Sequence, residues 1–355
     1  MRGLRPEETA QYLSVLQTLR SSYPFYDMHV HPYEVLFDRF TYENEITSPG
    51  VLSLAGKSYT TPSVTKFSFP EMGDFNDDPR SQRLQDISVM LLRKVYGNVG
   101  EQVFIDQMAL SGIDRVLLLP VASDSGTPNQ FHSRMRWVKQ FYTNQEKFWI
   151  AGSIPGSLDG SEIKQYVCSQ KQEYGIRAIK CHPVVSGIDL STPARQEWLE
   201  ELLCACHESQ LPLIIHSGRN NPYWGGSRGN FGALNNLKDI NMSLSGKPVI
   251  LAHAGFHRCK TSEIEQEGLP MLNNMLQMHS NLHVDISGLT FEPLKLVVRS
   301  VSSERILFGS DALYSSQWEA VTMAMHALKE SGMALEENFI QYASINPQKT
   351  IFKDQ

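Results

Sequence analysis

The chain has 355 residues, 41% of them hydrophobic, and it carries 32 lysines and arginines against 38 aspartates and glutamates, a net charge of −6. This mildly acidic balance argues against a nucleic acid or an anionic membrane as partner. The apolar runs are far shorter than the ~20 residues that span a bilayer, and the first residues contain no signal-peptide core. Five cysteines without framework spacing indicate reduced thiols and predict a cytoplasmic protein.

The N-terminal part predicts one helix followed by one strand. A helix is expected over 6–20, because Pro6 suits a first helical turn and Leu16 and Leu19 extend an apolar stripe. The strand is expected at about 25–31, with the sequence Phe-Tyr-Asp-Met-His-Val-His. Alternate residues of a strand share a face, so His29 and His31 project together, about 7 Å apart along the strand. Two imidazoles placed in this way suit one divalent ion.

Residues 33–98 interrupt the pattern with turn signals such as the Ser-Pro-Gly sequence at 48–50. A helix is expected inside the segment over 79–96, where Pro79 suits the first position and Gly97 follows the last. Loops of this length in compact domains are usually functional or disordered. We interpret the segment as an insertion after the first strand that forms a lid over the site. A surface excursion without a role in binding is the alternative.

From residue 99 onward, helices and apolar strands alternate regularly, which implies a parallel sheet. Together with the first strand, this gives eight strands, and we predict a single (β/α)8 TIM barrel domain over 1–355 that contains the 33–98 insertion. A doubly wound open sheet is the competitor, but no Gly-x-Gly-x-x-Gly follows the first strand. The later strands are expected at 113–120, 147–154, 175–181, 211–216, 248–253, 281–287 and 304–310, separated by helices at 99–111, 130–145, 161–173, 193–209, 232–244, 268–279 and 291–301, with closing helices at 316–331 and 335–352.

Residues that can bind a metal or carry charge stand at the ends of five of these apolar stretches. The C-terminal ends of the strands are where a barrel of this class keeps its chemistry. We therefore expect these side chains to share one site at the barrel mouth. They are His29 and His31, Lys180 and His182, His216, His253, and Asp311.

This arrangement resembles the amidohydrolase superfamily over roughly residues 23–352. It is most similar to the amidohydrolase-related branch, which includes the aminocarboxymuconate-semialdehyde decarboxylase-like enzymes. The Gly-Ser-Asp sequence at 309–311 and the Ile-Asn-Pro sequence at 345–347 fit that branch as well. The resemblance implies one divalent metal per chain, held by His29, His31, His216 and Asp311. Such a donor set suits Zn²⁺ with one position open, and Mn²⁺ and Fe²⁺ are further candidates.

The remaining strand-end residues have several expected roles. The Lys-Cys-His-Pro sequence that begins at Lys180 matches a pattern of the same branch, so Lys180 is either an ammonium that pairs with an anionic substrate or a carboxylated bridge between two metals. His253 and Asp311 are the candidates for proton transfer. His182 is expected to line the pocket, with metal ligation as the alternative. Asp27 would point inward beneath His29, where it either accepts a hydrogen bond from a ligand imidazole or plays a structural part.

The loops after the fifth and sixth strands contain further candidates for substrate binding. Arg219 lies in a glycine-rich loop with a second arginine and two aromatic residues, which suits a planar or carboxylated substrate. His257 follows His253 by four residues. Both Arg219 and His257 are expected to contact substrate, and a solvated surface position is the alternative for each.

Two chemistries fit these residues. The first and broader expectation is a hydrolase in which metal-activated water attacks an amide, ester or lactone carbonyl of a small, anionic substrate. The alternative is a metal-dependent, non-oxidative decarboxylase of a carboxylated small molecule. A non-catalytic barrel and a metal-free lactonase are weaker alternatives. A homodimer is a further possibility, since it is the commonest closed assembly.

Overall fold

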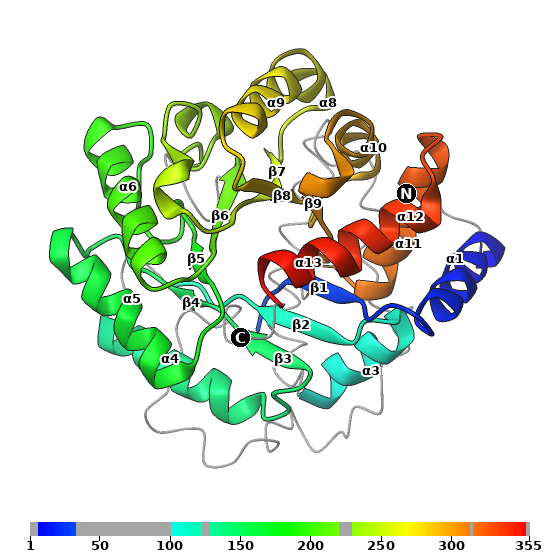
Figure 1. Cartoon of the computed structure of the whole chain (residues 1–355), viewed down its shortest axis with the longest axis horizontal. Coiled ribbons are helices and arrows are strands. Elements are labelled where there is room, and N and C mark those ends of the chain that lie inside the picture. Colours follow the sequence, from blue (N-terminus) through cyan, green and yellow to red (C-terminus); the bar gives the residue numbers. More distant parts are fainter. Residues whose placement is uncertain (1–5, 33–100, 123–127, 220–228, 313–314, 353–355) are drawn as a thin grey trace.

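The computed structural model describes residues 6–32, 101–122, 128–219, 229–312 and 315–352. Its strands lie at the centre of the molecule and its helices surround them (Figure 1). Every strand pair is parallel, as the alternating pattern predicts. The strands are β1 Tyr26–Val30, β2 Arg115–Leu118, β3 Phe148–Ile150, β4 Gly152–Ser153, β5 Ile179–Cys181, β6 Leu213–Gly218, β7 Val249–His257, β8 Leu282–Asp285 and β9 Ile306–Leu307.

The strands form two ladders, β1–β2–β3 and β4 through β9, that share one continuous segment. Only Ala151 separates β3 from β4. The backbone N–H of Ala151 donates to the carbonyl of Leu118 on β2 (2.9 Å). The N–H of the next residue, Gly152, donates to the carbonyl of Ala178 beside β5 (2.8 Å). Because one segment pairs on both sides, β3 and β4 together correspond to the single strand expected at 147–154.

Backbone hydrogen bonds also join the last strand to the first. The N–H of Met28 donates to the carbonyl of Phe308 (3.0 Å), and the N–H of Asp311 donates to the carbonyl of His29 (2.8 Å). A parallel bridge between Val30 and Ala312 continues this pairing. The α/β fold with a parallel, barrel-like arrangement of eight strand segments is thereby confirmed.

Most helices agree with the sequence patterns. No helix in the described ranges has both the length and the apolar character needed to cross a membrane. The α-helices are α1 Pro6–Leu19, α3 Glu101–Ser111, α4 Pro128–Phe141, α5 Gly160–Tyr174, α6 Pro193–Glu208, α8 Thr261–Glu263, α9 Leu269–Met278, α10 Phe291–Ser300, α11 Gln317–Glu330, α12 Leu335–Ile340 and α13 Asn346–Thr350. Short 3-10 turns η5 Leu234–Asn236, η6 Met242–Ser245 and η8 Ser303–Arg305 and π-helical turns η7 Ile264–Gly268 and η9 Gln341–Ile345 complete the set.

Two expected helices differ from the structure. The helix expected at 232–244 is replaced by the 3-10 turns η5 and η6, and the side chain of Asn241 accepts a hydrogen bond from the N–H of Ser243. Such local side-chain bonds compete with helical ones. The final helix, expected at 335–352, contains the π-helical turn η9 directly before α13. Pro347 near the start of α13 lacks the N–H that would close a normal turn there.

The predicted insertion and lid over 33–98, including its helix at 79–96, lie outside the described residues. Most of the glycine-rich loop after the fifth barrel strand, residues 220–228, also lies outside them. The insertion therefore stays a prediction.

The C-terminal residues close the barrel at its amino-terminal end. Phe352 is 3% exposed, and its ring stacks on Tyr26, the first residue of β1 (centroids 4.5 Å apart), and on Trp149 of β3 (4.7 Å). The guanidinium groups of Arg115 and Arg177 lie over the same Trp149 ring, at 4.6 and 4.4 Å. Aromatic packing and cation–π contacts thus seal the end of the barrel opposite the strand ends that hold the histidines.

We expect Phe352→Ala to lower the free energy of unfolding by about 3 kcal/mol, because it leaves a cavity between two buried aromatic rings. Urea unfolding followed by tryptophan fluorescence measures this loss. Met278→Ala is the control, because Met278 is 53% exposed and its truncation should change stability by less than about 0.5 kcal/mol. Equal effects of the two variants would show that the aromatic stack does not hold the barrel base.

Candidate metal centre

Three of the four predicted metal ligands come together at the carboxyl ends of the strands. His29 and His31 lie at the end of β1, and Asp311 follows β9. All three are buried, and their ligand atoms lie within 4.8 Å of one another. The Oδ1 atom of Asp311 is 3.2 Å from Nε2 of His31 and 3.6 Å from Nε2 of His29. The alternation of a strand thus delivers both imidazoles to one face, as predicted.

Hydrogen bonds on the far side of each ring determine which nitrogen can bind a metal. Nδ1 of His29 is 2.9 Å from a carboxylate oxygen of Asp285, and Nδ1 of His31 is 3.1 Å from the carbonyl of Leu119. Both partners are acceptors, so each Nδ1 carries the hydrogen and each neutral ring keeps a lone pair on Nε2. The two Nε2 atoms are 3.2 Å apart. Two lone pairs that converge with a carboxylate oxygen fit a shared cation.

His216, the fourth predicted ligand, lies beside this group of three. Its Nδ1 is 3.1 Å from Nε2 of His253, and Nδ1 of His253 is 2.8 Å from the carbonyl of Ser287. The carbonyl only accepts, so His253 donates from Nδ1 and accepts at Nε2, and His216 in turn donates from Nδ1. This leaves a lone pair on Nε2 of His216, an atom that is buried and lacks a hydrogen-bond partner among the described residues. An orphaned acceptor of this kind also fits a metal.

Lys180 provides a buried positive charge next to the triad. The side chain is fully buried, and its Nζ lies 3.4 Å from Nε2 of His29. Burial lowers the pKa of Lys180 to about 8, although the carboxylates of Asp285 and Asp311 oppose this shift. A cation in this position can attract a substrate carboxylate or stabilise a developing oxyanion.

His182 lies against His216, with ring centroids 3.9 Å apart and nearly parallel planes. Its Nδ1 accepts a hydrogen bond from the backbone N–H of Val185 (3.4 Å), so the hydrogen of the neutral ring sits on Nε2. His182 is thus the opposite tautomer to the predicted ligands and is a hydrogen-bond donor. The pocket-lining role expected for His182 stays a prediction.

His257 and Arg219 lie at the rim of the same site. The ring of His257 is 4.7 Å from that of His253, and its Nδ1 is 2.8 Å from the carbonyl of Arg219. The guanidinium of Arg219 pairs with Glu263 at 2.9 Å, and the side chain is 44% exposed. The structure thus places the ring of His257 against the histidine cluster and directs the charged end of Arg219 toward Glu263.

Asp27 was expected either to accept a hydrogen bond from a ligand imidazole or to play a structural part, and no imidazole is among its hydrogen-bond partners in the structure. Its carboxylate accepts hydrogen bonds from the backbone N–H and hydroxyl of Ser310, from Nε2 of Gln317 (2.8 Å) and from the backbone N–H of His29 (3.1 Å). Burial raises the pKa of this carboxyl to about 6, although these hydrogen bonds oppose the shift. Asp27 therefore ties β1 to the residue before Asp311, which is the structural alternative.

Sequence reasoning missed two residues of the site, Asp285 and Ser287. Asp285 is the residue that bonds the imidazole of His29, and both residues follow the apolar part of β8. The available signal was the rule used for the other strands, namely a polar residue at the carboxyl end. The Val-Asp-Ile-Ser sequence at 284–287 has such residues.

Residues 26–338 match the family model described as amidohydrolase. The chain belongs to the amidohydrolase family. The resemblance read from the histidines and Asp311 is therefore confirmed, and the protein is an enzyme of the amidohydrolase superfamily. A comparison of its sequence with those of curated proteins finds no match.

Solved structures share the fold of this amidohydrolase. Dihydroxybenzoic acid decarboxylase from Polaromonas sp. JS666, with bound manganese, has a TM-score of 0.57 at 11% identity over 92% of this chain and 96% of its own. 5-Carboxyvanillate decarboxylase from Novosphingobium aromaticivorans DSM 12444, complexed with manganese, has a TM-score of 0.55 at 16% identity over 93% and 96%. A protein described as amidohydrolase II has a TM-score of 0.53 at 14% identity over 92% and 98%.

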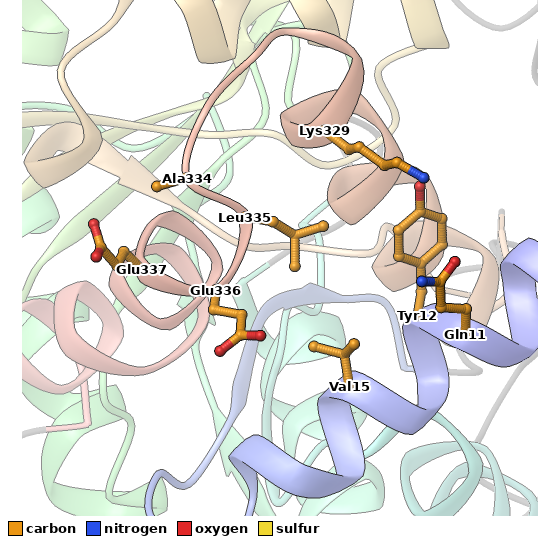
Figure 2. A pocket seen from close by; sticks show the side chains of 8 residues that line it. All are labelled: Gln11, Tyr12, Val15, Lys329, Ala334, Leu335, Glu336 and Glu337. Atoms are coloured by element: carbon orange, nitrogen blue, oxygen red, sulfur yellow. The ribbon is translucent and has the colours of Figure 1, made fainter.

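A separate groove of about 510 Å³ lies on the helical ring of the amidohydrolase, between α1 and the start of α12 (Figure 2). Tyr12 and Val15 of α1 face Leu335 and Glu336 across it, and Lys329 closes one end. None of its lining residues belongs to the metal-binding triad. The groove is therefore a different place from the triad at the strand ends.

Proposed function

We propose that this amidohydrolase is a metal-dependent, non-oxidative decarboxylase of a carboxylated small molecule. The observation that carries the proposal is the fully buried Lys180, whose charge lies beside the triad of His29, His31 and Asp311. A buried ammonium next to a metal site fits an anionic substrate group. The manganese-containing decarboxylases among the similar folds support this choice over the hydrolysis that was the first expectation from sequence.

In this proposal His29, His31, His216 and Asp311 hold one divalent ion, either Zn²⁺ or Mn²⁺. When bound, such an ion would withdraw electrons from substrate oxygens and help to orient the carboxyl group. The ammonium of Lys180 pairs with an anionic oxygen of the substrate, donates a proton to the carbon that loses CO₂ and becomes a neutral amine. The bond to the carboxyl carbon breaks, its electron pair stays on the substrate carbon, and the proton takes the place of CO₂.

Hydrolysis of an amide, ester or lactone is the second candidate function. The family itself favours it, and the carboxylate of Asp311 is placed to accept a proton from an attacking water. Both chemistries use the same metal site and the same cationic wall. They differ in their products, because only the decarboxylase releases CO₂.

Elemental analysis of the purified enzyme, followed by a screen of carboxylated aromatic compounds for CO₂ release, tests the proposal. We expect about one divalent ion per chain, lost in the His29→Ala, His31→Ala double variant, and CO₂ release that depends on the ion. The control is His132→Ala, His326→Ala, because these two histidines lie on the helices α4 and α11 outside the barrel.

Several outcomes would contradict the proposal. Carbonyl hydrolysis without CO₂ would favour the hydrolase, and two ions per chain would indicate a carboxylated Lys180 as a bridge. An enzyme that cannot take up added Zn²⁺ or Mn²⁺ would contradict both metal-dependent functions and would favour the metal-free lactonase or the non-catalytic barrel.

A further inference from the structure

Asp285 is the last residue of β8, a strand that supplies none of the predicted metal ligands, and it bonds both His29 and His253. Its side chain is 1% exposed. One carboxylate oxygen, Oδ2, is 2.9 Å from Nδ1 of His29. The other, Oδ1, accepts the backbone N–H groups of His253 and Ser287, both at 3.0 Å, and the hydroxyl of Ser287. Every partner of Asp285 in this set is able to donate a hydrogen bond.

The charge state of Asp285 determines what it imposes on His29. The backbone N–H groups of His253 and Ser287 and the hydroxyl of Ser287 all donate to this carboxylate, which are the surroundings of an ionised carboxyl group. An ionised carboxylate only accepts hydrogen bonds. The hydrogen of the neutral His29 ring therefore sits on Nδ1, and the lone pair sits on the Nε2 that lies 3.2 Å from Nε2 of His31.

Ser287, two residues further along, acts on a second ligand through its carbonyl. The carbonyl accepts from Nδ1 of His253 (2.8 Å), and Nε2 of His253 accepts from Nδ1 of His216 (3.1 Å). The chain of donors and acceptors has one direction, and it ends with the lone pair on the buried Nε2 of His216. The backbone bond from His253 to Asp285 holds the middle ring of this chain in place.

We propose that the end of β8 sets the tautomers of the metal ligands on two other strands, with Asp285 acting on His29 directly and the Ser287 carbonyl acting on His216 through His253. Asp285 and His253 are then positioning residues, and in this proposal His253 holds the tautomer of His216. The proposal rests on the metal-dependent function proposed above. Hydrogen bonds of this kind typically change metal affinity 10- to 100-fold.

The variant Asp285→Asn tests this inference sharply, because it keeps the shape of the side chain. The backbone N–H groups of His253 and Ser287 require an oxygen at the Oδ1 position, so the amide nitrogen must face His29. There it would donate to Nδ1 and move the hydrogen of the ring to Nε2, the nitrogen needed by the metal. We expect a loss in Zn²⁺ and Mn²⁺ affinity of about 10- to 100-fold. Competition with a chromophoric chelator measures it.

Nitrogen-15 NMR of the histidine rings provides a readout that a merely structural role would not change. In metal-free wild-type enzyme we expect His29 and His216 to carry their hydrogens on Nδ1, and in Asp285→Asn we expect His29 alone to switch to Nε2. Ser287→Ala is the matched control. It removes a hydroxyl that lies 3.0 Å from Nδ1 of His29 and 3.1 Å from Nδ1 of His253, but it keeps the Ser287 carbonyl and Asp285, so both tautomers should persist.

The wild-type spectrum decides the question even where Asp285→Asn fails to fold, since His29 or His216 with its hydrogen on Nε2 would overturn the inference. Unchanged metal affinity and an unchanged His29 tautomer in a folded Asp285→Asn variant would overturn it as well, while the metal-dependent function would stand. Conversely, the predicted tautomers in a wild-type enzyme that binds no metal would contradict the proposed function and leave the tautomer assignment intact.

Discussion

Asp311→Asn should leave the barrel folded and lower kcat by at least about 10³-fold, which corresponds to roughly 4 kcal/mol of transition-state stabilisation. The Asp311 carboxylate is the anionic member of the triad, 3.2 Å from Nε2 of His31. Neighbouring histidines hold the pKa of Asp311 below its usual range even though burial opposes this, so the carboxylate is charged at neutral pH. An amide at this position loses the charge that offsets a divalent ion.

Asparagine is the appropriate replacement because of the backbone at this position. Asp311 has a φ of 60°, in the left-handed region that asparagine tolerates better than most residues. Asp159→Asn, at the exposed start of α5, is the matched control and should retain wild-type turnover. Metal content, circular dichroism and turnover together separate a lost ion from a lost fold. Full turnover in a folded Asp311→Asn variant would exclude Asp311 from both the metal site and proton transfer.

Acidification should unfold the metal-free enzyme within one or two pH units below 6.5. Burial is the largest cause that lowers the pKa of nine histidines among the described residues, and the shift is largest for six of them, so the unfolded chain binds more protons than the folded one as the pH falls. Each such proton changes the stability by about 1.4 kcal/mol per pH unit. The six are His29 (pKa about 4), His182 and His216 (well below the usual value), His253 (about 4), His257 (about 3) and His283 (about 4).

One carboxyl group opposes this effect. The pKa of Asp27 is raised from 3.8 to about 6 in the folded state. Between these two pH values the folded protein therefore binds one proton at Asp27 that the unfolded chain does not bind. Subtracting this proton leaves a net uptake of about five protons on unfolding. Even half of that uptake would lower the free energy of unfolding by roughly 3–4 kcal/mol per pH unit, against a total of about 5–15 kcal/mol for a typical domain.

Urea unfolding of chelator-treated enzyme at several pH values between about 7 and 5 measures this dependence. His283→Gln provides a control for the proton count, because His283 lies early in β8, where its Nδ1 bonds the carbonyl of Asn281. That variant should reduce the slope by up to about 1.4 kcal/mol per pH unit, the share of a single proton. A free energy of unfolding that does not change across the range would contradict the buried, neutral state of the histidines.

The sequence predicts those features of the site that depend on local periodicity. The two-residue repeat of a strand suffices to put His29 and His31 on one face, and the recurring strand ends bring Asp311 to them. Contacts that depend on how distant strands pair were not predictable. His29 bonds Asp285 across 256 positions of the chain, and only the parallel barrel shows that these residues are neighbours.

The backbone around His253 shows a second reason why sequence patterns are insufficient, here for the end of a strand. The sixth strand was expected to end at residue 253, but β7 extends to His257. The pairing shifts from His216 opposite Ala252 to Gly218 opposite His257, while His253 and Ala254 adopt φ values of 57° and 51°. Left-handed conformations are rare for such residues, so tertiary contacts and not local preference stabilise this bulge. The helix expected at 232–244 is absent for a local reason instead, since the side chain of Asn241 makes a hydrogen bond there that competes with the helix.

The aromatic seal around Phe352 has a practical consequence for handling the enzyme. A linker that follows residue 352 starts at the end of the barrel opposite to the metal ligands, because Phe352 stacks on the first residue of β1 while His29 and His31 lie at the other end of that strand. Attachment to a solid support through a linker after residue 352 would therefore turn the carboxyl ends of the strands, with the metal ligands, toward the solution.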